Sequence, residues 1–173
     1  MSRRRSHARR YAVLALYQWQ VTGLDPAEIG RHFFDDPTWM DVVADALGDF
    51  DNGQKPTGAA DSVYDLALFQ QLLHGVPEQL AALDVQLESV LDRPLRQVTP
   101  VDLAVLHMAV YELINSPEIH SRVILNEAVE LAKEFGSSDD SHRYVNGVLD
   151  KIARKLRTSE LADVAAPGRV HRH

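Results

Sequence analysis

The arginines near the N-terminus are the residues best suited to binding an anionic polymer. Residues 1–10 contain no acid and five arginines, which are Arg3, Arg4, Arg5, Arg9 and Arg10. A guanidinium group donates paired hydrogen bonds to phosphate, and side chains one helical turn apart can reach successive phosphates. The alternative interpretation is a solvated N-terminus that binds nothing. Both interpretations stay open at this level.

A second candidate site lies at His142, Arg143 and Tyr144, where the last predicted helix begins. An exposed aromatic ring beside a cation can stack on a single-stranded base, which is worth about 1–3 kcal/mol per base. The competing interpretation is that Tyr144 packs against the preceding helix. The residues that we expect to contact RNA are therefore Arg4, Arg5, Arg9, Arg10, Arg143 and Tyr144.

No residue pattern predicts enzyme chemistry. The chain has no phosphate-binding loop, no dinucleotide-binding glycine motif and no nucleophile elbow. Its eight histidines are scattered and form no helical pair with metal-ligand spacing. Glu127, Glu130 and Glu134 recur at the spacing of one polar helix face. We predict no catalytic residue, no cofactor and no metal.

The net charge of −7 is unevenly distributed along the chain. Residues 1–10 carry +5, whereas the other 163 residues hold 13 basic and 25 acidic side chains and so carry −12. The chain is therefore an acidic body with a basic arm at residues 1–10. Such an arm concentrates phosphate-attracting charge, while an acidic body discourages indiscriminate binding of nucleic acid.

Length and composition favour one globular domain. The chain has 173 residues, of which 45% are hydrophobic and 25% charged, and it has no cysteine. The absence of cysteine excludes disulfides and fits a reducing compartment. No apolar run is long enough for a membrane span or a secretory signal. We therefore expect a cytoplasmic protein that does not bind membranes.

The elements that must position these side chains are helices. Helical periodicity recurs along the chain, and no strand pattern competes with it, which predicts an all-α fold of about seven helices. Helices are expected over residues 8–22, from residue 25, from Tyr64 to near Gly75, from Pro77 until Pro94, over 99–115, over 123–135 and from about 138 to 157. A further short helix can run from Pro37 to Leu47.

The predicted helical domain spans residues 11–157, contains one insertion and is followed by a tail. Residues 35–61 form an acidic insertion, since ten acids between Asp25 and Asp65 face only two cations. Within this insertion, residues 48–61 are expected to form a surface loop. After Arg157 the helical period is lost, so residues 158–173 are expected to form a flexible tail.

Three sequence blocks carry a resemblance to a known family. They read R-R-Y-A-V-L-A-L-Y-Q-W-Q from Arg9, N-E-A-V-E-L-A-K-E-F-G from Asn126 and Y-V-N-G-V-L-D-K from Tyr144. In this order and spacing they resemble the bacterial NusB family of transcription antitermination factors. The likeness covers about residues 5–34 and 62–157.

The resemblance implies a fold of two packed helical bundles and an RNA-binding adaptor rather than an enzyme. Members of the family bind the boxA element of nascent ribosomal-operon transcripts together with NusE, a small-subunit ribosomal protein. The pair joins the RNA polymerase elongation complex with other Nus factors and suppresses termination.

The resemblance also assigns residues. It places the family's basic arm on Arg5 and Arg9, and its aromatic residue on Tyr144. It places the surface that faces NusE on Asp102, Tyr111 and Asp140. The sequence departs from the family pattern at Ser6 and His7 within the arm, in the added length of residues 35–61, and at residues 119–122 before the N-E-A block.

Two other readings of the chain compete with this one. A NusB-like module also occurs in RNA cytosine methyltransferases, but the 16 residues after Arg157 are too few for a cofactor-binding α/β domain. The second alternative is a self-associating helical scaffold that leaves RNA unbound. Light scattering and an RNA-binding assay on one sample distinguish the scaffold from an RNA-binding protein.

Overall fold

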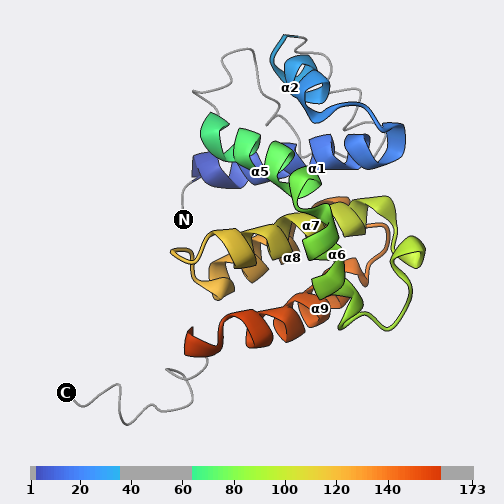
Figure 1. The fold of residues 1–173 in the computed structure, drawn as a ribbon, viewed down its shortest axis with the longest axis vertical. Coiled ribbons are helices and arrows are strands. Elements are labelled where there is room, and N and C mark those ends of the chain that lie inside the picture. Colours follow the sequence, from blue (N-terminus) through green and yellow to red (C-terminus); the bar gives the residue numbers. More distant parts are fainter. Residues whose placement is uncertain (1–2, 36–63, 161–173) are drawn as a thin grey trace, which may run out of the picture.

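The computed structural model describes residues 3–35 and 64–160, and within these ranges the chain is helical with no strand. The helices are drawn in Figure 1. Their bounds are Arg3–Thr22 for α1, Pro26–Asp35 for α2, Leu66–Glu78 for α5, Leu80–Glu88 for α6, Pro100–Asn115 for α7, Ser121–Phe135 for α8 and Ser141–Leu156 for α9, with a 3-10 turn, η1, at Leu95–Gln97. The predicted all-α fold is confirmed.

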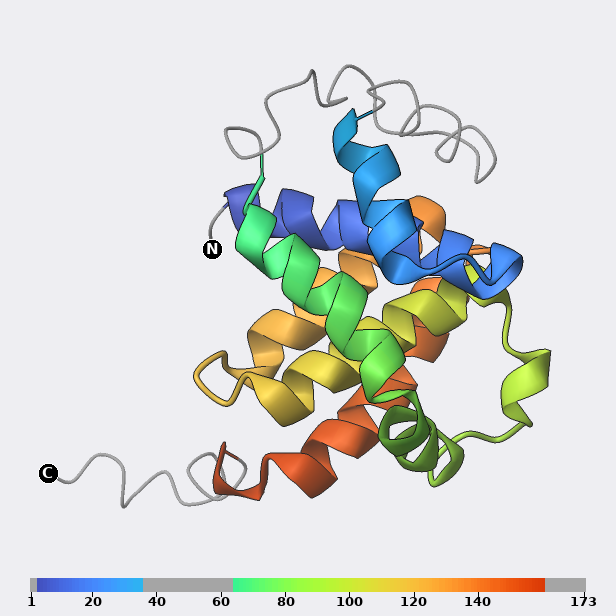
Figure 2. The same ribbon diagram turned by 45° about the horizontal axis from the view of Figure 1, so that its top comes forward.

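The helices pack as two bundles. Helices α1, α2 and α5 contact one another in the first, and α6, α7, α8 and α9 do so in the second. Figures 1 and 2 show the first bundle above the second in both views. Helix α1 packs on α7 as well as on α5, so one hydrophobic core runs through both bundles.

Helix α7 is the central element because its sequence is apolar on nearly every side. Almost all of its residues from Val101 to Leu113 are buried, and it contacts helices of both bundles. A helix that is hydrophobic around its circumference is stable only inside a core. Glu112 interrupts this apolar sequence and is itself buried, so it requires a partner within the protein.

Helix α1 begins at Arg3, five residues before the predicted start at Ala8. Its first turns are held by the segment that enters α5, since the backbone N–H of Asp65 donates to the carbonyl of Arg4 at 3.0 Å. The Arg4 guanidinium donates to the carbonyl of Tyr64 at 3.2 Å. The basic residues from Arg3 onward therefore belong to a helix that is packed on the body.

The break between α5 and α6 lies at Gln79 and not near Gly75, where the sequence predicted it. Gly75 is a helical residue whose missing side chain makes room for Tyr111 of α7, because a Cβ there would lie 2.5 Å from the Tyr111 ring. Pro77 lies in the last turn of α5, where it has no backbone N–H to donate to the carbonyl of Leu73, and the helix ends one residue later at Glu78. The glycine thus serves close packing and not helix termination.

Residues that follow α9 pack against the protein body up to Glu160, which contacts the start of α8. Arg157 is buried and donates to the carbonyls of Leu113, Ser116 and Ile119 near the end of α7. It also binds Glu160 at 2.6 Å. The Glu160 carboxylate accepts from the backbone N–H and the hydroxyl of Ser121, the first residue of α8. The first residues of the predicted tail therefore pack on the body.

Several sequence predictions lie outside the described residues. These are the helix over 37–47, the loop at 48–61, nearly all of the acidic insertion and residues 161–173 of the tail.

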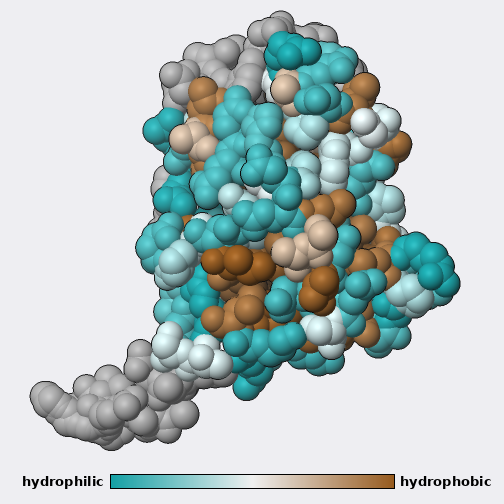
Figure 3. Space-filling view, in the orientation of Figure 1, coloured by the Kyte–Doolittle hydropathy of each residue, from teal (hydrophilic) through white to brown (hydrophobic). Residues whose placement is uncertain are grey.

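On the face drawn in Figure 3, hydrophobic atoms gather at the level of α6 among largely hydrophilic surroundings, and α6 carries the exposed Val85.

Candidate nucleic-acid and protein interface

Arg9 lies inside the protein, although the sequence predicted that it contacts phosphate. Its side chain is 1% exposed. Its Nε donates to Oε1 of Glu112 and its Nη2 to Oε2, both at 2.8 Å, and Nη1 lies 3.5 Å from Glu127. This is the bidentate geometry that arginine forms with a carboxylate. Burial alone would lower the pKa of Arg9, but the hydrogen bonds and charge of Glu112 outweigh it, so the pKa is raised and the guanidinium stays charged.

The buried ion pair gives Arg9 a structural role. Glu112 is 2% exposed, and a buried carboxylate without a cation would be strongly destabilising. Because its donors face Glu112 and Glu127, Arg9 does not present them to a ligand on the surface. The expected phosphate contact by Arg9 is therefore replaced by a link between α1, α7 and α8.

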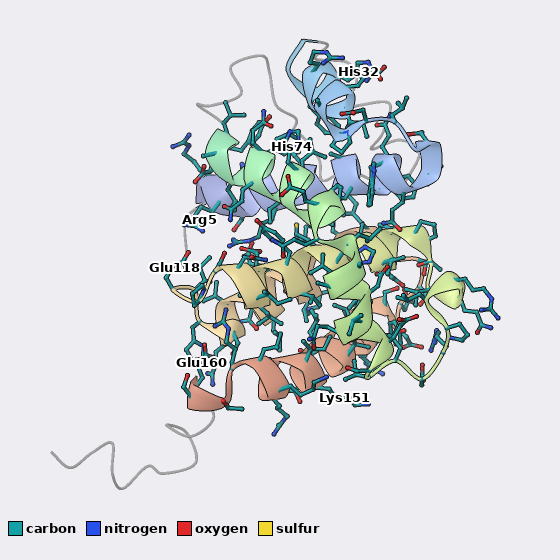
Figure 4. All side chains as sticks on the ribbon, viewed as in Figure 1. Arg5, His32, His74, Glu118, Lys151 and Glu160 are labelled. Atoms are coloured by element: carbon teal, nitrogen blue, oxygen red, sulfur yellow. The ribbon has the colours of Figure 1, made fainter. Side chains whose placement is uncertain are left out.

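The other arginines of the arm lie against acidic residues of α8. Arg10 binds Glu134 at 3.1 Å, with both side chains less than a fifth exposed. Ser6 donates to Glu127 at 3.2 Å, and a shallow hollow between α1 and α8 is lined by Arg3, Ser6, His7, Arg10, Glu127, Glu130 and Glu134. These carboxylates reduce the positive potential of the arm. Arg4 is exposed and Arg5 partly so, and Figure 4 shows Arg5 at the outer edge of this region.

The guanidinium group of Arg93 stacks on the ring of Tyr144. Arg93 is not among the residues that the sequence predicts to bind RNA. The Arg93 guanidinium carbon lies 4.4 Å from the centroid of the Tyr144 ring, which is a cation–π distance. The ring is partly buried against the core, and its hydroxyl is buried without a hydrogen-bond partner among the described residues. Burial raises the pKa of Tyr144, and the charge of Arg93 opposes this rise. The ring therefore packs partly against the core, as the competing interpretation expected, while base stacking by Tyr144 stays a prediction.

Arg143 and Asp140 are the exposed residues of this region. The side chain of Arg143 is 79% exposed and that of Asp140 82%, and their charged atoms lie 3.9 Å apart. A surface pair of this kind contributes little to stability. Both groups are therefore available to a partner, beside the Arg93–Tyr144 stack.

Asp102 and Tyr111 are buried, although the sequence analysis expected them on a surface that faces a protein partner. Asp102 is 6% exposed and accepts from the hydroxyls of Ser141 at 3.1 Å and Ser137 at 3.3 Å. Tyr111 is also 6% exposed, with its ring against Gly75. Asp102 thus connects the start of α7 to the loop before α9. Tyr111 packs between α5 and α7.

An apolar groove is lined by Leu103 and His107 of α7. It encloses about 410 Å³, and its walls include Trp19, Leu80, Leu95 and Leu103. Arg96 and Asp84 lie at its polar side. Partly exposed apolar walls with a polar margin are typical of surfaces that bind another protein.

The sequence contained signals for the residues that were missed. Arg9 is a cation within the apolar run of the first helix, and Glu112 is an acid within the apolar run of the central helix. A lone charge on a buried face predicts a buried partner of opposite sign. Arg93 gives no such signal, because its approach to Tyr144 depends on the loop between α6 and η1.

The described part of the chain gives no sign of a metal centre or a membrane span. Residues 3–35 and 64–160 contain no cluster of three or more histidine or carboxylate ligands. None of the helices within these ranges is both long and apolar enough to cross a bilayer.

Comparison with known proteins identifies related sequences over most of the chain. Residues 6–154 match the family model of the NusB family. A transcription antitermination protein NusB from Nitrosococcus oceani is 44% identical over 160 residues, which cover 92% of each chain. The protein of the same name from Alkalilimnicola ehrlichii is 46% identical over 171 residues, 96% of this chain and 92% of the relative.

A solved structure has the same fold. The NusB of T. maritima superposes with a TM-score of 0.60 at 26% identity, covering 89% of this chain and 92% of that one. The two-bundle arrangement is thus shared with a structure of known fold. The relatives carry the name of a role in transcription and not of an enzymatic activity.

Proposed function

Since this chain belongs to the NusB family of transcription antitermination proteins, we propose that it binds boxA-type single-stranded RNA together with NusE. In this proposal the pair joins the RNA polymerase elongation complex with other Nus factors. The observation that carries the RNA-binding part is the stack of Arg93 on Tyr144, beside the exposed Arg143.

The stack supplies a surface for a nucleobase. A base can lie on the outer face of a guanidinium plane or on an aromatic ring, and every base has such a face. Arg143 then pairs with a neighbouring phosphate, and Arg4, Arg5 and Arg10 of α1 extend the positive surface. We leave Arg9 out of the contact set, because it holds Glu112.

The RNA surface is limited by the glutamates of α8. Glu134 holds Arg10, and Glu127 and Glu130 lie beside the other residues of the arm. A phosphate that binds Arg10 must therefore compete with a carboxylate. This competition predicts weak RNA binding by the chain alone, and tighter binding when NusE adds its own contacts to the same RNA.

The NusE surface in this proposal combines the exposed Asp140 with the apolar groove at Leu103. Asp102 positions this surface by holding Ser137 and Ser141, and it makes no direct contact. Leu103 is partly exposed in the groove, so Leu103→Glu places a charge in the partner's path. The expected result is loss of NusE capture with unchanged helix content by circular dichroism. Normal capture by the folded variant would contradict the groove.

The test of the function measures RNA affinity with and without NusE. Fluorescence anisotropy of labelled boxA RNA should give weak binding to the chain alone and at least tenfold tighter binding with NusE present. Scrambled RNA of the same length serves as the control. Light scattering on the same sample monitors self-association, and a self-associated protein that binds neither RNA nor NusE would favour the scaffold alternative.

A further inference from the structure

Helix α9 presents a basic face on an otherwise acidic chain. Arg143, Lys151, Arg154 and Lys155 are exposed, and Asp150 is the only acid of the helix, so four cations and one acid give it +3 within a chain of net charge −7. Asp150 pairs with Arg154 at 2.9 Å. Residues 143, 147, 151 and 154 follow one another at helical spacing along one side. Figure 4 shows Lys151 projecting away from the body.

Two asparagines on this surface have side-chain amides that the fold does not use. Asn126 of α8 and Asn146 of α9 are exposed, and their side chains form no hydrogen bond with any described residue. Both line one hollow of about 260 Å³ between the two helices. The charged groups of its lining are Arg122, Arg154, Arg157, Asp150 and Glu160, of which Asp150 pairs with Arg154 and Glu160 with Arg157. The other residues of their sequence blocks are explained by the fold, since Glu127 holds Ser6 and Arg9 while Ala128 and Leu149 lie in the core.

Gly147 is equally unexplained by packing. It lies in the interior of α9, where glycine disfavours a helix relative to alanine, yet a Cβ at this position would meet no atom within 4 Å. Nothing within the described protein therefore requires a glycine here. An open glycine between Arg143 and Lys151 lets another chain approach the helix backbone closely.

We infer that the exposed face of α9 and the hollow beside it bind the nucleotides that flank the boxA-type element on the same RNA strand. Lys151 and Arg154 would pair with phosphates, and the amides of Asn126 and Asn146 would donate to and accept from a base edge or a ribose hydroxyl. Arg143 and Tyr144 lie at the N-terminal end of the same face, so the strand continues from the proposed stacking site. This inference rests on the proposed function.

The positive charge favours RNA over a protein as the occupant. An RNA strand offers a phosphate at every nucleotide and base edges for amide side chains. From Arg143 to Arg154 the face spans about 17 Å at 1.5 Å per residue, which is enough for more than one phosphate. An acidic protein segment is the alternative occupant, and the experiment below distinguishes the two.

The test compares the minimal boxA RNA with RNA that is extended at either its 5′ or its 3′ end, by anisotropy with NusE present. For the unmodified protein, one of the two extensions should tighten binding severalfold. In Lys151→Ala this gain should shrink, and the slope of log affinity against log salt for that RNA should fall by about 0.7, the value for one phosphate contact on a single strand. The double variant Asn126→Ala with Asn146→Ala should lose the gain and keep its salt slope.

Arg31→Ala is the matched control, because Arg31 is an exposed helical cation on α2 and its removal changes the net charge by the same amount. It should keep the full gain from extension. If the minimal RNA does not bind, the proposed function fails. If the minimal RNA binds and neither extension adds affinity, or if Arg31→Ala and Lys151→Ala behave alike, the inference about α9 is wrong while the proposed function stands. Loss of a protein partner from Lys151→Ala without any change in RNA affinity would instead assign the face to an acidic protein.

Discussion

The pair of Arg9 and Glu112 shows how one residue's burial changes its assignment. The residue type and spacing of Arg9 predict a phosphate-binding arm. In the structure Arg9 instead neutralises the carboxylate of Glu112, whose side chain is 2% exposed. The sequence singled out Arg9 as a candidate site residue, but it gave no prediction for Glu112. It could not pair them, because they are 103 positions apart in the chain and meet only where α1 crosses α7.

Removal of one partner from this pair should destabilise the fold strongly. We expect Arg9→Ala to lower the free energy of unfolding by about 3–5 kcal/mol, because it leaves Glu112 charged and buried. Replacement of both residues, Arg9→Met with Glu112→Leu, should recover most of the loss. Urea denaturation followed by circular dichroism measures both effects. A loss below about 1 kcal/mol in the single variant would contradict a structural role for the pair.

Glu160 provides a pH-dependent contact at the residue scale. Burial would raise its pKa, but hydrogen bonds from Ser121 and Arg157 outweigh burial and lower it below 4.5. A carboxyl with a lowered folded pKa contributes stability above its unfolded pKa and loses that contribution as the pH falls through the folded pKa. Glu160→Gln should therefore be less stable than the unmodified protein at neutral pH, and the difference should shrink below pH 4.5. A difference that is constant from pH 7 to pH 3 would show that the charge is not involved.

At the scale of elements, most helices are predictable and their ends are less so. The apolar period predicted α7, α8 and α9 to within about two residues at most ends, because each helix carries a long set of buried apolar residues, while Pro100 marks the start of α7 and Gly136 the end of α8. The start of α1 and the break after α5 were misplaced. Both depend on tertiary contacts, namely those of Arg4 with the residues before α5 and those of Gly75 with Tyr111.

Gly75 and Gly147 lie in helix interiors, and their substitution compares the effect of helix propensity with the effect of tertiary contacts. Gly147→Ala should stabilise the protein by about 1 kcal/mol, because alanine favours the helix and the new methyl group meets no atom within 4 Å. Gly75→Ala should destabilise it by about 1–3 kcal/mol or more, because the methyl group would collide with Tyr111. Thermal unfolding of the two variants gives opposite shifts in Tm. Shifts of the same sign would mean that helix propensity alone decides both positions.

At the scale of the whole molecule, the arrangement of charge decides what the surface can bind. The sequence divides into a basic arm and an acidic body, but the fold places the arm on the glutamates of α8 and leaves α9 as a basic face. Charges counted along the sequence could not show that α9 is the basic face, because side chains far apart in the sequence neutralise one another in the folded protein. The sequence placed Arg143 and Tyr144 together at the start of α9, but it could not show that Arg93 stacks on Tyr144, and the RNA contact of these residues stays a prediction.

Two substitutions at Tyr144 decide whether this residue binds single-stranded RNA by stacking on a base. Tyr144→Phe keeps the ring, whereas Tyr144→Leu keeps apolar bulk against the core and removes the ring. With NusE present, the Phe variant should bind boxA RNA as the unmodified protein does. The Leu variant should lose about 1–3 kcal/mol of binding free energy without a change in the salt slope. If the folded Leu variant binds boxA RNA as tightly as the Phe variant, Tyr144 only packs against the core and the account of the RNA site is contradicted.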